Sequence, residues 1–62
     1  SAQRYYRLRG ASLMELKLFR SAVTDCHKAL QMDPFDGRSR ANLKKALYEI
    51  GVVTDDVKGK KT

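Results

Sequence analysis

The 62-residue sequence has only one cysteine, one histidine and one proline, and it has no tryptophan. A single cysteine cannot close a disulfide within the chain, and Cys26 with His27 is too small a set for a structural zinc site. A chain this short without such cross-links gains only about 3–5 kcal/mol of net stability from its core. The sequence therefore predicts no metal and no cofactor, and it favours a reducing compartment, either the cytoplasm or the nucleus.

Long apolar runs are also missing, because the longest uninterrupted ones span two or three residues. This pattern predicts a soluble chain with neither a membrane span nor the apolar core of a signal peptide. Charge, in contrast, is plentiful and unbalanced. Thirteen Lys and Arg against seven Asp and Glu give a net charge of +6, which favours encounters with acidic peptides, nucleic acids or anionic lipids.

Apolar and small residues recur every three or four positions in three segments, at residues 2–16, 19–32 and 37–50. This spacing places them on one face of a helix in each segment. The remainder, 51–62, is polar and has no period, so we expect it to lack regular structure. The sequence predicts an all-α protein with three helices.

The expected ends of these helices carry local signals. Asp33 precedes Pro34, and this pair ends the second helix because proline lacks an N–H donor and disfavours the helical conformation of the residue before it. Asp36 is suited to the N-cap of the third helix. Gly51, just beyond that helix, is suited to a left-handed C-terminal cap.

The spacing of small and aromatic residues in the first two segments resembles the tetratricopeptide repeat, a helix-turn-helix of about 34 residues. The matching positions are Tyr6, Gly10, Leu13, Phe19, Ala22, Cys26, Ala29 and Pro34. In this family Gly10 and Ala22 would mark the closest approach of the two helices. Arg9 stands where the family usually has leucine, and Lys17 stands where a turn glycine is frequent.

The resemblance implies a repeat over residues 1–36, followed by a capping helix over 37–50 that closes an α-solenoid. About three such repeats are normally needed for stability. A repeat with one cap would therefore leave an edge of the first helix uncovered at Tyr5, Tyr6 and Leu8. We expect the chain to be part of a longer array, with self-association through this edge as the alternative.

The resemblance also implies a function, because the first helices of successive tetratricopeptide repeats line a groove that binds peptides, often acidic C-termini. By position, the groove residues here would be Arg4, Arg7, Ala11, Met14, Arg38, Asn42, Lys45 and Tyr48. Arginine suits this role because its planar fork binds a carboxylate through two parallel hydrogen bonds. The expectation is a non-catalytic adaptor or co-chaperone module, with these basic residues forming a merely solvated face as the alternative.

In co-chaperones of this family, the last repeat before the cap contributes a lysine and, four residues later, an arginine that hold the acidic C-terminus of a chaperone. Arg4 keeps the first charge, whereas Leu8 lacks the second. The resemblance therefore implies an acidic-peptide site that differs from the usual chaperone clamp.

Two other classes of non-catalytic protein stay open. Tyr5, Tyr6 and Tyr48 among basic residues could stack on bases in an RNA-binding helical repeat, and the chain could be a structural oligomerisation module. Catalysis is not expected. Cys26 and His27 point about 100° apart on a helix, so they cannot form a nucleophile and base pair. We expect Cys26 to be a small buried apolar residue and His27 to face solvent.

Overall fold

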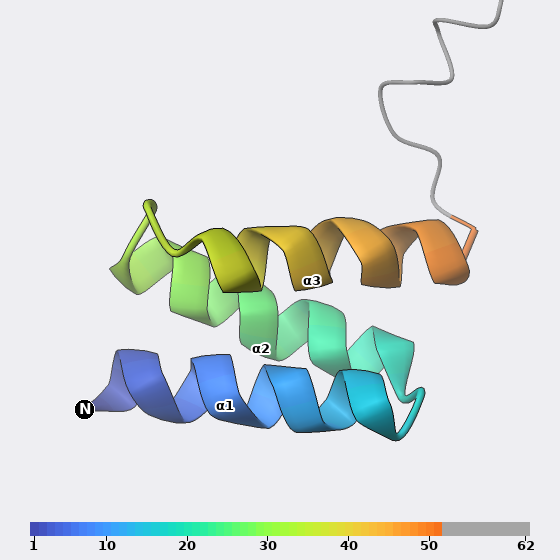
Figure 1. Ribbon diagram of the computed structural model, residues 1–62, viewed down its shortest axis with the longest axis horizontal. Coiled ribbons are helices and arrows are strands. Elements are labelled where there is room, and N and C mark those ends of the chain that lie inside the picture. Colours follow the sequence, from blue (N-terminus) through green and yellow to red (C-terminus); the bar gives the residue numbers. More distant parts are fainter. Residues whose placement is uncertain (52–62) are drawn as a thin grey trace, which may run out of the picture.

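The computed structural model describes residues 1–51, which form three helices (Figure 1). They are α1 (Ala2–Glu15), α2 (Phe19–Met32) and α3 (Gly37–Glu49). The predicted all-α class is confirmed, and each predicted helix agrees with the observed one to within a residue at either end. Of the tail expected at 51–62, residues 52–62 lie outside the described residues. Within residues 1–51, no helix is long and apolar enough to cross a membrane.

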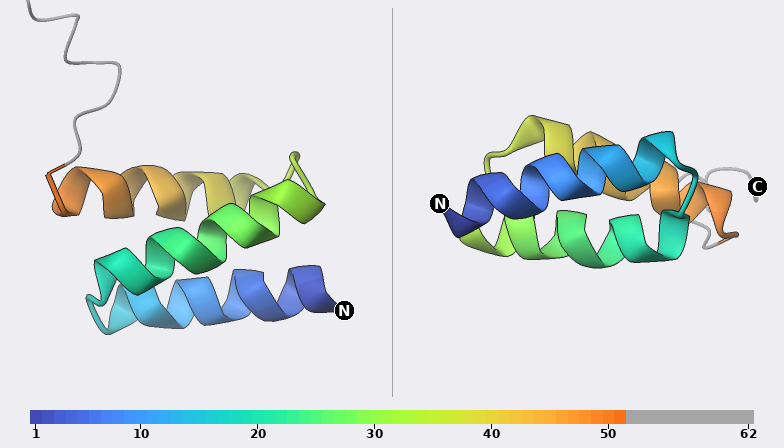
Figure 2. Two further views of the ribbon diagram at one scale, coloured as in Figure 1. Left: turned by 180° about the vertical axis from the view of Figure 1, so that it is seen from behind. Right: turned by 90° about the horizontal axis from the view of Figure 1, so that it is seen from below.

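Successive helices run in opposite directions, so α1 and α3 point in the same direction and α2 is antiparallel to both (Figures 1 and 2). Helix α2 packs extensively against α1 and α3, while the contact between α1 and α3 is smaller. The short connections enforce this arrangement, because each one reverses the chain within a few residues. The consequence is a furrow between α1 and α3 with α2 packed against both helices.

The connection from α1 to α2 is a Schellman turn. The backbone N–H of Leu18 donates to the carbonyl of Leu13 at 2.9 Å, and that of Lys17 donates to the carbonyl of Met14 at 3.0 Å. Lys17 adopts a φ of 61°, in the left-handed region that favours glycine. The position where the resembled repeat often has glycine thus has the backbone conformation that suits glycine.

Replacing Lys17 with glycine should stabilise the chain by about 0.5–1 kcal/mol, because the Cβ strain at positive φ exceeds the entropy that glycine loses on folding. Urea unfolding of the two proteins measures this difference. Lys44→Gly is the matched control, since Lys44 lies exposed within α3, where glycine should destabilise by about 1 kcal/mol. Equal destabilisation by both substitutions would contradict the turn geometry.

The connection from α2 to α3 is organised by Asp36. Its carboxylate accepts hydrogen bonds from the N–H of Ser39 at 3.1 Å, from the Ser39 hydroxyl at 2.6 Å and from the Gln3 side chain at 2.7 Å. The predicted N-cap is therefore confirmed, and the same carboxylate also joins the start of α1 to the start of α3. Gly51 has a φ of 90°, as expected for the residue after α3.

The fully buried apolar residues are small, namely Ala22, Cys26, Ala29 and Ala46. Small side chains let helices approach closely, and Gly10 on α1 is the extreme case. A Cβ added at Gly10 would lie 2.9 Å from Cys26 Sγ and 3.5 Å from Asp25 Cβ. Gly10 and Ala22, expected at the closest approach of α1 and α2, are both buried, but the nearest α2 neighbours of Gly10 are Cys26 and Asp25.

The remaining positions of the repeat pattern are less buried. Tyr6, Leu13 and Phe19 are half-buried, and Pro34 is exposed in the turn before α3. Pro34 directly follows the C-cap of α2 at Asp33, so its predicted role in ending that helix fits the structure.

Candidate functional site

The furrow between α1 and α3 contains two adjoining hollows. The first, of about 320 Å³, is lined by Arg7, Leu8, Ala11, Arg38, Ala41 and Asn42. The second, of about 360 Å³, shares Ala11 and Asn42 with the first and is otherwise lined by Met14, Glu15, Lys17, Phe19, Lys45 and Glu49. Because the hollows share residues from both helices, they form one continuous depression, called the α1–α3 groove below.

The two ends of the α1–α3 groove differ in charge. The first hollow contains two guanidinium groups, from Arg7 and Arg38, and small apolar side chains from Ala11 and Ala41, with no acidic residue. The second hollow contains lysines and glutamates in equal number. An anion would therefore be attracted to the first hollow, which lies toward the start of α1 and α3.

Arg7 is the more buried of the two arginines at this end of the groove. Its Nε is buried and has no hydrogen-bond partner within residues 1–51, a state that costs about 1–3 kcal/mol when a donor stays unsatisfied. The charge of Arg7 also helps to lower the pKa of Asp36. Arg7 thus lies close enough to the start of α3 to act together with Arg38.

The structure brings together six of the eight residues that the sequence assigned to the groove. These are Arg7, Ala11, Met14, Arg38, Asn42 and Lys45. Arg4 and Tyr48 are exposed and line neither hollow. Leu8, where the resembled clamp has an arginine, lines the first hollow instead as an apolar side chain. Sequence reasoning missed Glu15 and Glu49, although each lies one helical turn from a predicted groove residue.

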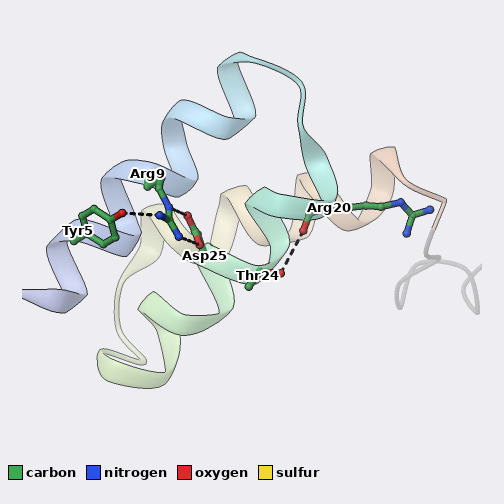
Figure 3. Close-up of polar contacts among 5 residues, drawn as sticks. All are labelled: Tyr5, Arg9, Arg20, Thr24 and Asp25. Atoms are coloured by element: carbon green, nitrogen blue, oxygen red, sulfur yellow. Dashed lines mark hydrogen bonds and ion pairs between the residues drawn. The ribbon is translucent and has the colours of Figure 1, made fainter.

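The ion pair within residues 1–51 lies outside the groove, between Arg9 and Asp25 (Figure 3). Asp25 is buried, and its carboxylate accepts from Arg9 Nε at 2.5 Å and from Nη2 at 3.1 Å. Arg9 Nη1 donates to the Tyr5 hydroxyl at 2.5 Å. This hydrogen-bonded carboxylate raises the pKa of Arg9 above its ordinary value. Arg9, at a position where the resembled repeat usually has leucine, therefore links α1 to α2 through this ion pair.

Two tyrosines of α1 already hold cations against their rings. The guanidinium of Arg9 lies 4.9 Å from the ring centre of Tyr5, and the ammonium of Lys28 lies 5.1 Å from that of Tyr6. The two rings also meet edge to face, with their centres 5.2 Å apart. Base stacking on the same ring faces would compete with these contacts.

The candidate catalytic groups are not arranged for chemistry. Cys26 is fully buried, and burial raises the pKa of its thiol, with a smaller contribution from the charge of Asp25. The thiolate that nucleophilic attack requires is therefore disfavoured. His27 is exposed, as predicted. Among residues 1–51, no group of three or more His, Cys, Asp or Glu side chains could hold a metal ion.

No protein-family model matches this chain, and no match was found among curated proteins or solved structures. The resemblance to the tetratricopeptide repeat therefore stays a prediction, based on the spacing of seven residues in the first two helices and of Pro34 in the turn after them.

Proposed function

We propose that the chain is a non-catalytic protein-interaction module that binds an acidic peptide in the α1–α3 groove. The observation that supports this proposal is the first hollow, where Arg7 from α1 and Arg38 from α3 flank a small apolar surface. A cytoplasmic or nuclear adaptor or co-chaperone role belongs to the same proposal.

The chemistry of the hollow favours a carboxylate next to an apolar side chain. A guanidinium can bind a carboxylate through two parallel hydrogen bonds, and two guanidiniums can share a pair of carboxylates. Ala11 and Ala41 leave space for a small aliphatic side chain between the charges. The acidic C-terminus of a chaperone, the partner that the family resemblance implies, would supply such carboxylates.

Titration of the chain with an acidic C-terminal peptide tests the groove. Arg7→Gln and Arg38→Gln should each weaken binding at least tenfold, because a hydrogen bond to a charged group contributes about 1.5–3 kcal/mol. Lys44→Gln is the matched control, since Lys44 is exposed on α3 and lines neither hollow. It removes the same charge and should change the affinity less than about twofold.

The same titration separates the competing functions. Equal weakening by all three variants would show that only the net charge attracts the peptide, and it would contradict a site in the groove. A single-stranded RNA of matched charge should be released at physiological salt. An RNA that stays bound while the peptide is released would favour the RNA-binding alternative. A chain that binds neither the peptide nor the RNA would favour the third alternative, a structural oligomerisation module.

A further inference from the structure

The face of α1 opposite the buried Gly10 carries an exposed apolar stripe. Its members are Tyr5, Leu8, Ser12 and Leu16, the last being the C-cap of the helix. Their spacing of three, four and four places them along one line on the helix surface. The three large side chains are 52%, 48% and 67% exposed. This set, called the outer stripe below, is a large apolar surface for a fold whose fully buried apolar residues are all small.

Two opposite charges flank the outer stripe on the same side, one near each end of α1. Arg4 lies in the first turn and Glu15 is the last residue of the helix. Both are exposed, and the ion pair within residues 1–51 is that of Arg9 with Asp25, which leaves Arg4 and Glu15 without one there. The eleven positions between them place them about 16 Å apart along the axis, too far for contact within one helix.

We propose that the outer stripe binds the outer stripe of a second copy of this chain, with the two α1 helices antiparallel. A two-fold axis near the level of Gly10 would place Arg4 about 9 Å to one side and Glu15 about 7.5 Å to the other. Arg4 of each copy then faces Glu15 of the other. The pairing forms twice, as an isologous interface requires.

The sizes of the side chains along the outer stripe favour the same antiparallel register. The axis that pairs Arg4 with Glu15 also sets Leu8 of one copy opposite Ser12 of the other, so a large side chain meets a small one. Tyr5 then lies opposite Leu16. Arg9, on the other side of the stripe, is already paired with Asp25. A parallel pair would instead leave Arg4 of one copy and Glu15 of the other about 16 Å apart along the helix axes, so neither ion pair would form.

This complementarity is the reason to choose a second copy over an unrelated partner. A helix of 14 residues is about 21 Å long, so a contact between single helices falls below the standard size of a stable interface. The dimer is therefore weak and depends on concentration and salt. The inference does not rest on peptide binding. Leu8 and Glu15 also line the α1–α3 groove, whereas Arg4, Tyr5, Ser12 and Leu16 line neither of its hollows.

Sedimentation equilibrium over a range of concentrations at low salt tests the register through charge swaps. The unsubstituted chain should dimerise, and Arg4→Glu or Glu15→Arg alone should weaken the dimer about tenfold, since each creates two like-charge pairs. The double variant Arg4→Glu/Glu15→Arg should restore it. An equimolar mixture of the two single variants should also restore it, as a heterodimer.

Loss of helix cannot produce this pattern of dimerisation among the variants. Arg4→Glu places an acidic residue in the first turn and Glu15→Arg places a basic residue in the last turn, and both changes favour a helix. Circular dichroism of each variant checks this. A chain that stays monomeric at every concentration would overturn the proposal and mean that a different chain covers the outer stripe. Equal dimerisation of the single and double variants would overturn it as well, because the antiparallel register would then be absent.

Discussion

Replacing Gly10 with valine should unfold most of the chain. A Cβ at this position lies 2.9 Å from Cys26 Sγ, closer than such atoms pack, and valine adds two further methyl groups toward α2. Overpacking of this kind costs about 3 kcal/mol at the upper end of its usual range. That cost is comparable to the whole net stability of about 3–5 kcal/mol expected for a domain of this size. Urea unfolding followed by circular dichroism measures the loss.

Two companion variants assign that loss to the contact with Cys26. Gly37→Val should have little effect, because a Cβ at Gly37 meets nothing within 4 Å. Gly10→Ala should destabilise the chain when Cys26 is present. It should be neutral or stabilising in a Cys26→Ala background, since alanine is favoured over glycine in a helix by about 1 kcal/mol. The same effect of Gly10→Ala in both backgrounds would show that Sγ is not the obstacle.

Removing the carboxylate of Asp36 should destabilise the chain by about 2 kcal/mol at neutral pH, because Asp36→Ala removes an N-cap and leaves neighbouring donors unpaired. The affected donors are the amide and hydroxyl of Ser39 and the side chain of Gln3. Asp33→Ala is the control in the same turn. Asp33 accepts an exposed hydrogen bond from the N–H of Phe35 at 3.0 Å, so its loss should cost less.

The contribution of Asp36 should also depend on pH. Burial by itself raises the pKa of this carboxyl, whereas the two hydrogen bonds from Ser39 lower it. Gln3 and the charge of Arg7 add to this effect, so the pKa in the folded chain lies below the ordinary value. A depressed folded-state pKa adds stability above the unfolded-state value of about 4, and this stability is lost as the pH falls through the folded-state pKa.

Unfolding free energies of the unsubstituted chain and of Asp36→Ala, measured from pH 7 down to about 2.5, should therefore converge in acid. A difference between the two proteins that does not change with pH would contradict the ionised, hydrogen-bonded carboxylate. Asp33→Ala supplies the reference for the general acid sensitivity of the chain.

The helices and their caps could be predicted closely because their signals are local. The period of apolar residues places α2, and the backbone preference before Pro34 ends it. Asp36 caps α3 through a bond to an amide only three residues later. Interactions over three or four positions depend little on how the helices pack against one another.

The groove could be predicted in part. The interval of seven residues from Arg7 to Met14 places both on one face of α1, and the structure confirms that both line the groove. Whether Arg4 or Tyr48 also reaches the groove depends on how far each helix is rotated about its axis. A shift of a few tens of degrees moves a side chain from the rim to open solvent, and sequence periodicity does not define that angle so finely.

By itself, the sequence determined that this chain is all-α, where its helices begin and end, and which small residues its helices bury. Only the tertiary structure decided that Gly10 packs against Cys26, that Arg9 pairs with buried Asp25, and which basic side chains share a groove. The reason is the range of the forces involved. Helix formation and capping act between neighbours in the sequence, whereas the ion pair joins residues sixteen positions apart and forms only after α1 and α2 have packed in one register.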